Sequence, residues 1–203
     1  MGNGTGASYN HSDYGCRDYQ RLPWYLSASS LTTVTIDDGI TSIGPYMFYG
    51  CSAITNLTIP VDCVYDSGNV FYGCSNVTAV SITPGVSGIG TNHSKDYSYS
   101  AWYVGKTKTR TITVEEGVIE LGGFTFAYCT NTSINLPASL TVANESDFAG
   151  IKDVNVDSKN EVLSSDLAGI LYRGNHLMHV PNNVSEYTFP SYVTSIGSYA
   201  FYG

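Results

Sequence analysis

Two groups of side chains in this chain have types and spacings that could support catalysis. The segment 85–90 (GVSGIG) is close to the Gly-x-Ser-x-Gly turn that carries a hydrolase nucleophile, but Ile89 stands where that turn requires glycine. The paired acids at positions 37–38 and 115–116 could act as general acid and base, yet each pair precedes a turn glycine, where solvated carboxylates are common. No phosphate loop, dinucleotide fingerprint or metalloprotease helix is present. The residues therefore predict no enzyme and no cofactor, with a hydrolase site of another kind left open as an alternative.

Side chains that could bind a metal are equally sparse. Asp153-x-Asn155-x-Asp157 alternates like the start of a calcium loop, but serines replace the glycine and the glutamate that such a loop needs at positions 158 and 164. His176 and His179 lie three residues apart, and a metal site needs more convergent ligands than these two. We therefore predict no metal site.

Composition and charge exclude several classes of protein. The chain has 203 residues and a formal net charge of -8, and nucleic-acid binding depends largely on basic side chains, so we predict no nucleic-acid partner. No apolar run is long enough to cross a bilayer, which predicts a protein that is not membrane-embedded. The 21 glycines and 17 tyrosines, with abundant serine and threonine, favour strands and turns over long helices.

An internal repeat is the main feature of the sequence. Residues 24–51 align without a gap over residues 102–129, with eight identities in 28 positions. A shorter unit of about 23 residues recurs inside these blocks. It begins with a pattern such as Leu31-x-x-Val34-x-Ile36, continues through a turn and an apolar pair, and ends in an aromatic-Gly-Cys element. We count about seven such units.

Each unit is predicted to form one coil of a solenoid. The alternation of its core has a period of two, so Val34 and Ile36 face inward while their neighbours face outward, and Phe48 fills the coil. Stacked coils bury a continuous core and pair their strands in a parallel sheet. The sequence thus predicts a mainly β repeat solenoid with helix limited to short turns. Residues 1–23 would form an N-terminal flank, and 24–203 the coils.

These strings resemble a known family. Residues 31–60 and 187–203 are similar to the leucine-rich repeats of the BspA-like (Treponema pallidum-type) family, whose unit runs roughly L-x-x-L-x-I-P-x-x-V-x-x-I-G-x-x-A-F-x-x-C. A variant, hairpin-bearing repeat of the same family resembles the segment at about 154–181. The resemblance covers residues 24–203. It implies a right-handed solenoid coil and, for most relatives, a secreted or surface-attached protein that adheres to host proteins or other cells.

Several positions depart from the repeat or are explained by it. Asp66 falls at the position of Ile43, so we expect the second coil either to be looser there or to satisfy that carboxylate by hydrogen bonds. The third coil is about nine residues too long, and its excess at 91–100, before Trp102, is either a binding loop or a plain spacer. Ile89 of that coil is interpreted as a core residue. The last unit stops just after its Phe, so we expect the natural chain to continue and the last coil to be truncated.

The cysteines are interpreted mainly as core thiols. Cys51, Cys74 and Cys129 occupy one position of the repeat, where a small side chain packs under the next strand. A Cys51–Cys74 disulfide stays open, because adjacent coils stack about 5 Å apart. Cys63 should be buried, and Cys16 has no predicted partner.

The outward strand positions form the best candidate binding surface, a nearly uncharged sheet of hydroxyls and amides. They are Thr33, Thr35, Asn56, Thr58, Ala79, Ser81, Thr111, Thr113, Ser133 and Asn135. Amphipathic aromatic side chains that could anchor a protein or stack on sugars form a second candidate set. These are Tyr49, Tyr72, Tyr128, Tyr202 and, after the insertion, Trp102. The alternatives are a plain soluble sheet face with cross-strand Thr pairs, or an ice-binding Thr array.

Together these features predict a non-enzymatic, extracellular or cell-surface module for binding or adhesion. Its partner would be a protein or glycan of a host or neighbouring cell, and exposed coil ends could mediate self-association. The alternative is a structural spacer that displays another domain of a larger surface protein. Eight Asn-x-Ser/Thr sequons occur, and a glycan on the one at Asn56 would obstruct the candidate face.

Overall fold

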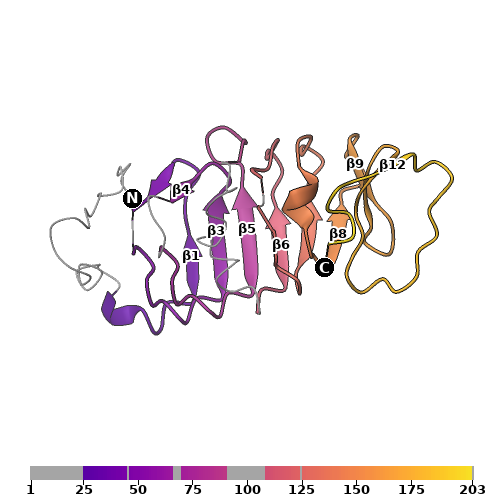
Figure 1. Cartoon of the computed structure of the whole chain (residues 1–203). Helices are drawn as coiled ribbons and strands as arrows, with labels where there is room; N and C mark the ends of the chain where they lie inside the picture. The colour runs from indigo at the N-terminus through magenta and orange to yellow at the C-terminus, as the bar shows by residue number, and fades with distance from the viewer. Residues whose placement is uncertain (1–24, 45, 66–69, 91–107, 124, 203) are drawn as a thin grey trace.

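The computed structural model describes residues 25–44, 46–65, 70–90, 108–123 and 125–202, which wind into an elongated stack of coils (Figure 1). Its elements are η2 (Tyr25–Ser27), β1 (Thr33–Thr35), β2 (Ser42–Ile43), β3 (Asn56–Pro60), β4 (Val64–Tyr65), β5 (Ala79–Thr83), β6 (Thr111–Val114), β7 (Ser133–Leu136), η4 (Glu145–Phe148), β8 (Asp153–Val156), β9 (Leu163–Ser165), β10 (Leu171–Arg173), β11 (His176–His179) and β12 (Ser195–Ile196). Both helices are short 3-10 turns, and the described residues contain no α-helix. The boundary expected between residues 23 and 24 lies outside the described residues.

A six-stranded sheet runs along one side of the stack in the order β1-β3-β5-β6-β7-β8. Every neighbouring pair in this sheet is parallel, as expected when each coil contributes one strand. One inward-facing apolar residue of each strand lies in register with its neighbours: Val34, Leu57, Val80, Ile112, Ile134 and Val154. The predicted fold class, a mainly β repeat solenoid with a parallel sheet, is confirmed.

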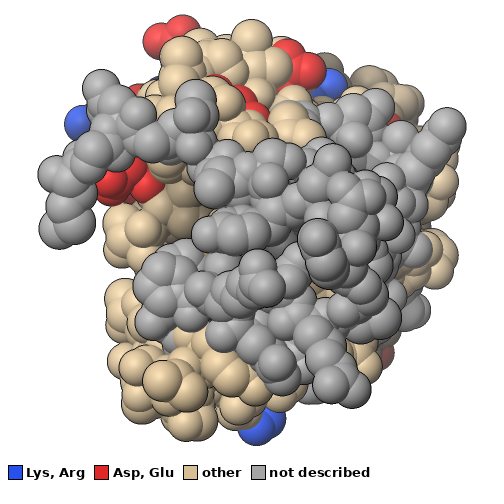
Figure 2. Space-filling view, turned by 90° about the vertical axis from the view of Figure 1, so that its left-hand side faces the viewer, with Lys and Arg blue, Asp and Glu red and all other residues tan. Residues whose placement is uncertain are grey.

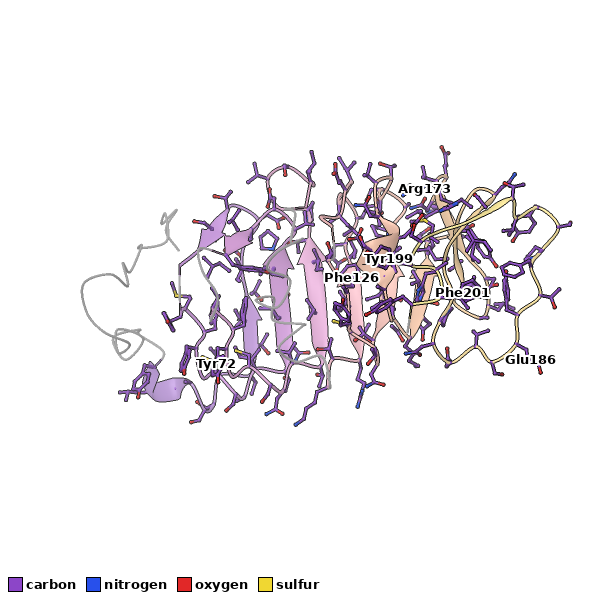
Figure 3. The ribbon with its side chains drawn as sticks, in the orientation of Figure 1. Tyr72, Phe126, Arg173, Glu186, Tyr199 and Phe201 are labelled. Atoms are coloured by element: carbon purple, nitrogen blue, oxygen red, sulfur yellow. The ribbon has the colours of Figure 1, made fainter. Side chains whose placement is uncertain are left out.

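The core lies between this sheet and the turns that close each coil. Val34, Ile36 and Phe48 are buried as predicted, and the ring of Phe48 stacks on that of Phe71 at 5.3 Å between centroids. Phe126 occupies the equivalent interior position further along the stack (Figure 3), and its ring lies 6.2 Å from that of Phe148. In both pairs one coil covers the aromatic side chain of the preceding one, which favours stacking.

The chain beyond β8 folds differently. Strands β9, β10 and β11 pair antiparallel, and β12 pairs parallel with β11, giving a second sheet in the order β12-β11-β10-β9. A separate apolar cluster forms beside it, with Ile170, Tyr172 and Leu177 among its members. Tyr187 and Phe189, in the segment 187–203 that is similar to the repeat, lie outside any strand. The parallel sheet thus ends at β8.

Two sequence-based expectations about the turn side of the coils are wrong. In the pairing of β2 with β4, Tyr65 lies opposite Ile43, where a constant spacing placed Asp66. The Tyr65 ring also contacts the ring of Phe71 edge-on at 5.8 Å. Asp66 itself lies outside the described residues.

Ile89 is the second correction, since it is 48% exposed and does not enter the core. It forms an isolated parallel bridge with Glu120. The next residue, Gly90, therefore takes the inward position of the coil. The Gly90 N–H donates to the Glu120 carbonyl at 2.8 Å, and a Cβ on Gly90 would lie 2.5 Å from the backbone nitrogen of Gly122. The next coil approaches too closely here to leave room for a core side chain.

Candidate binding face

Parallel pairing arranges the outward side chains of the main sheet in two rows. The first row is Thr33, Asn56, Ala79, Thr111, Ser133 and Asp153. The second row is Thr35, Thr58, Ser81, Thr113, Asn135 and Asn155. The structure thus brings all the predicted strand positions onto one face, and it extends both rows to β8. We call these two rows the sheet face.

The two halves of the sheet face differ in how their polar groups are paired. Towards β8, Asn155 donates to the Asn135 carbonyl oxygen at 3.4 Å, and Ser133 donates to an Asp153 carboxylate oxygen at 2.9 Å. Towards β1, the hydroxyls of Thr35 and Thr58 have no side-chain hydrogen bond to another described residue, so they remain open to a ligand. The open half of the face is therefore the better place for recognition.

A shallow hollow of about 250 Å³ lies on the sheet face around β3, β5 and β6. Its lining includes the row residues Asn56, Thr58, Ala79, Ser81 and Thr113, together with Glu115. The Ser81 hydroxyl donates to the Glu115 carboxylate, which fixes that acid over the face. This is a small polar depression in an otherwise flat surface.

The sheet face carries little charge. Asp153 is its only ionisable residue, and the Lys152 ammonium lies 3.5 Å from the Asp153 carboxylate. The described part of the solenoid's N-terminal end also shows few charged side chains among many uncharged ones (Figure 2). Such a surface offers no strong field to attract either a polyanion or a polycation.

The aromatic candidates do not lie in the rows. Tyr49 and Tyr72 stack at 5.2 Å between ring centroids in turns outside the sheet, and Tyr72 is 57% exposed (Figure 3). Tyr128 instead contacts Tyr202 edge-on at 5.8 Å. The four tyrosines of the second candidate set thus form two separate pairs. Trp102 and the insertion at 91–100 lie outside the described residues.

The described cysteines are buried free thiols, so the Cys51–Cys74 disulfide that was left open is not formed. The Cys74 thiol donates to the Phe48 carbonyl at 3.2 Å. Burial raises the pKa of the Cys74 thiol to about 12, and the nearby Cys51 adds to the effect. Burial likewise raises the pKa of Cys63 to about 12, helped by Asp62. Protonated, enclosed thiols of this kind serve packing and supply no nucleophile. Cys16 lies outside the described residues.

A group that the sequence did not reveal joins η4 to β11 and β12. One ring nitrogen of His176 lies 2.6 Å from a Glu145 carboxylate oxygen, and the other lies 2.7 Å from the Ser195 hydroxyl. The second Glu145 oxygen accepts the Ser198 N–H at 2.8 Å. Serine, histidine and glutamate in contact are the parts of a nucleophile with its base. His176 is 19 residues from Ser195 and 31 residues from Glu145 along the chain, so no local sequence pattern indicates that the three are in contact.

The surroundings of this group favour a structural role. A hollow of about 260 Å³ lies beside it, lined by residues that include Glu145, Arg173 and Tyr199, but neither Ser195 nor His176 lines it (Figure 3 labels Arg173 and Tyr199). Ser195 lies in β12, whereas hydrolase nucleophiles usually stand on a sharp turn. The contacts tie the short η4 turn to the second sheet.

His179 is fully buried and is held by one hydrogen bond, from its Nε2 to the Ile151 carbonyl at 3.1 Å. Its Nδ1 atom is buried without a partner in the structure. Burial lowers the pKa of His179 to about 4, although the bond to Ile151 opposes the effect.

Within the described residues, no three His, Cys, Asp or Glu side chains gather closely enough to hold a metal ion.

The part of the chain that the structure describes also contains no helix long and apolar enough to cross a bilayer.

Residues 25–101, 99–168 and 172–203 match the family described as the BspA type leucine-rich repeat region, in six copies. No curated protein matches the chain.

Several solved structures of repeat proteins are similar to this one. A leucine-rich repeat protein from Eubacterium ventriosum has 20% identity and a TM-score of 0.48, over 93% of this chain and 49% of that one. A leucine-rich cell surface protein from Faecalibacterium prausnitzii has 19% identity and a TM-score of 0.43, over 84% of this chain and 58% of that one. The T. pallidum leucine-rich repeat protein has 16% identity and a TM-score of 0.37, over 60% of this chain and 57% of that one. The chain thus spans about half the length of the first of these proteins.

Proposed function

Because the chain belongs to the BspA-type leucine-rich repeat family, we propose that it is a non-enzymatic binding and adhesion module of an extracellular or cell-surface protein. The sheet face would recognise a protein or glycan of a host or neighbouring cell. Neither a nucleic acid nor a bilayer interior is a suitable partner for an acidic chain with few exposed basic groups.

The observation that carries this proposal is the register of the two rows. Main-chain pairing of six strands fixes the position of each outward side chain before any ligand arrives. A ligand that binds such a surface loses little free energy to the ordering of the protein, because the backbone is already ordered. Weak individual hydrogen bonds can then add up to useful affinity.

A charge placed in the middle of the sheet face tests the proposal. Thr111 lies near the centre of the first row, between Ala79 and Ser133, so Thr111→Arg would obstruct the face with a long cation. We expect its binding to immobilised matrix proteins and glycans to fall at least tenfold. Ser52→Arg is the matched control, since it adds the same charge in an exposed turn outside the sheet. If both variants bind all these ligands like the unmodified chain, the sheet face is not a binding surface.

That last result would support the alternative, a structural spacer that displays another domain of a larger surface protein. The regular stacking of coils suits such a role, because a solenoid holds its two ends at a fixed separation. A spacer would tolerate substitutions throughout the sheet face as long as folding is preserved.

Self-association through a coil end is the other interaction that we propose. Residues 195–203 repeat the sequence of residues 42–50 almost unchanged, yet Phe201 is 56% exposed whereas its counterpart Phe48 is covered by Phe71. A hollow of about 360 Å³ lies beside Phe201 and is lined by Phe189 and Tyr187, among other residues. An apolar surface of this kind suits a second copy of the chain, because the covered surface inside the stack is built from the same sequence.

A further inference from the structure

One of the residues that line the hollow on the sheet face has a small side chain. Ala79 lies in register between Asn56 on β3 and Thr111 on β6, and it is the only residue of the two rows that lacks a polar side chain. Ala79 lines the hollow of about 250 Å³ together with Thr58, Ser81 and Thr113 of the second row, so its methyl group leaves room for a ligand there. Pockets for drug-sized ligands begin at about 300 Å³, so this one fits a single ring of a larger ligand.

The groups around Ala79 both donate and accept hydrogen bonds. The Asn56 amide nitrogen donates to the Thr55 hydroxyl at 3.0 Å, which turns that amide and leaves its carbonyl oxygen as an acceptor. The Thr58 hydroxyl is free to donate among the described residues. On the opposite wall, the Glu115 carboxylate accepts from Ser81 with one oxygen and leaves the other available. Mixed donors and acceptors at fixed positions match ligand hydroxyls, which do both.

The charge and the shape of the wall exclude other classes of ligand. Glu115 is the only ionisable side chain that lines the hollow, so phosphate, sulfate or carboxylate groups would be repelled. Protein interfaces depend on aromatic, arginine or large apolar anchors that fill pockets in the partner, and the two rows contain none. An uncharged ligand rich in hydroxyl groups satisfies both conditions.

We propose that the Ala79 hollow binds one sugar ring of a neutral oligosaccharide that lies along the sheet face. The proposal rests on the function proposed above and narrows its ligand to one class. Thr58 would donate to a ring hydroxyl, while Asn56 and Glu115 would accept from others. Thr113 also lines the hollow, and a neighbouring sugar unit would contact Thr35, which lies beside Thr58 in the second row.

The experiment compares the unmodified chain with variants of the hollow on an array of neutral, sialylated and sulfated oligosaccharides. Titration calorimetry then follows with lactose, N-acetyllactosamine and maltotetraose, and with sialyllactose as the anionic comparison. Ala79→Leu fills the hollow, and we expect it to weaken binding of the neutral sugar at least tenfold. Glu115→Gln keeps the shape and removes the charge, and we expect about fivefold weaker binding because a charge-assisted hydrogen bond is lost. Ala168→Leu, in an exposed turn before β10, adds the same side chain away from the sheet face and should change nothing.

The outcomes separate this inference from the function on which it rests. Neutral-sugar binding that Ala79→Leu weakens and Ala168→Leu does not would support the hollow as the site. If the chain binds only proteins or anionic glycans and Thr111→Arg still abolishes that binding, the sheet face is a binding surface but the ligand class proposed here is wrong. Neutral-sugar binding that is unchanged by Ala79→Leu overturns the site. If Thr111→Arg changes the binding of none of the ligands, the binding function itself is overturned.

Discussion

The stack from β1 to β8 and the antiparallel sheet from β9 to β12 bury apolar side chains in different ways. In the stack, each coil covers the one before it with the same few residue types, and the buried side chains are mainly apolar, with Thr109, Thr125, Thr132 and Asp147 as buried polar exceptions. The second sheet closes a smaller cluster and relies on polar contacts beside it. Tyr172 donates to an Asp166 carboxylate at 3.2 Å and shares a hydrogen bond with the Tyr187 hydroxyl, and the single hydrogen bond of His179 is close by.

The difference shows that repetition and specific polar contacts respond to different changes. In the stack, most of the free energy comes from apolar area that each neighbour buries, and that contribution is insensitive to pH. In the second sheet, part of the free energy depends on the protonation of single side chains. The four predictions below test this contrast in order of decreasing effect.

Truncation of a core aromatic side chain should have the largest effect, and only inside the stack. Phe126→Ala removes a fully buried ring next to Phe148, so we expect the free energy of unfolding to fall by about 3–5 kcal/mol. Phe201→Ala removes the equivalent ring at the exposed end, where less area is covered, and we expect a loss of about 1 kcal/mol or less. Urea denaturation of both variants measures the two values. Equal losses would mean that the ring of Phe201 is as well packed as that of Phe126.

Acid should weaken the second sheet through His179. Burial lowers the pKa of His179 to about 4 in the folded chain, from an ordinary value of 6.5. Between these two values the unfolded chain binds a proton that the folded chain does not, so the free energy of unfolding falls as the pH drops below about 6.5. The full loss, reached near pH 4, corresponds to about 3 kcal/mol.

Denaturation of the unmodified chain and of His179→Gln from pH 7 to pH 4.5 measures this contribution. Carboxylates titrate in both proteins, so the difference between the two profiles isolates the histidine. We expect a flatter profile for His179→Gln over this range. Parallel profiles would show that the pKa of His179 is the same in the folded and the unfolded chain.

Self-association should depend on the aromatic residues at the end of the chain. Phe201 and Phe189 line the terminal hollow, so Phe201→Ala should weaken association of the chain with itself about tenfold or more. Tyr72→Ala is the matched control, because it removes an equally exposed ring from a turn in the stack. Analytical ultracentrifugation over a range of concentrations measures both. A chain that stays monomeric at all concentrations would refute self-association.

The contact between His176 and Glu145 should contribute least. Both side chains are about one-third exposed or slightly less, and exposed or half-exposed ion pairs contribute little. We expect Glu145→Gln to lower the free energy of unfolding by about 0.5–1 kcal/mol, and Glu120→Gln, on the exposed side of the stack, to change it less. A larger loss would mean that the connection between η4 and the second sheet is essential to the whole fold.

The contrast also explains what could be predicted from the sequence. The inward position of Val34 and the two outward rows follow from an alternation of period two, and a parallel stack fixes their register. The places of Tyr65 and Ile89 were predicted wrongly, because the turn side of a coil pairs loosely and tolerates a slip of one residue. The contacts of His176 with Glu145 and Ser195 do not recur from coil to coil, so no repeated pattern in the sequence could indicate them.

The spacing of the in-register strand residues has a consequence for how such chains gain and lose coils. Val34, Leu57, Val80, Ile112, Ile134 and Val154 are 23, 23, 32, 22 and 20 residues apart, yet their strands pair without a break. The sheet would therefore be preserved when coils are duplicated, deleted or exchanged at points inside the strands, whatever the length of the intervening turn. Joints made at a constant residue count would misplace the turns, as the slip at Tyr65 demonstrates.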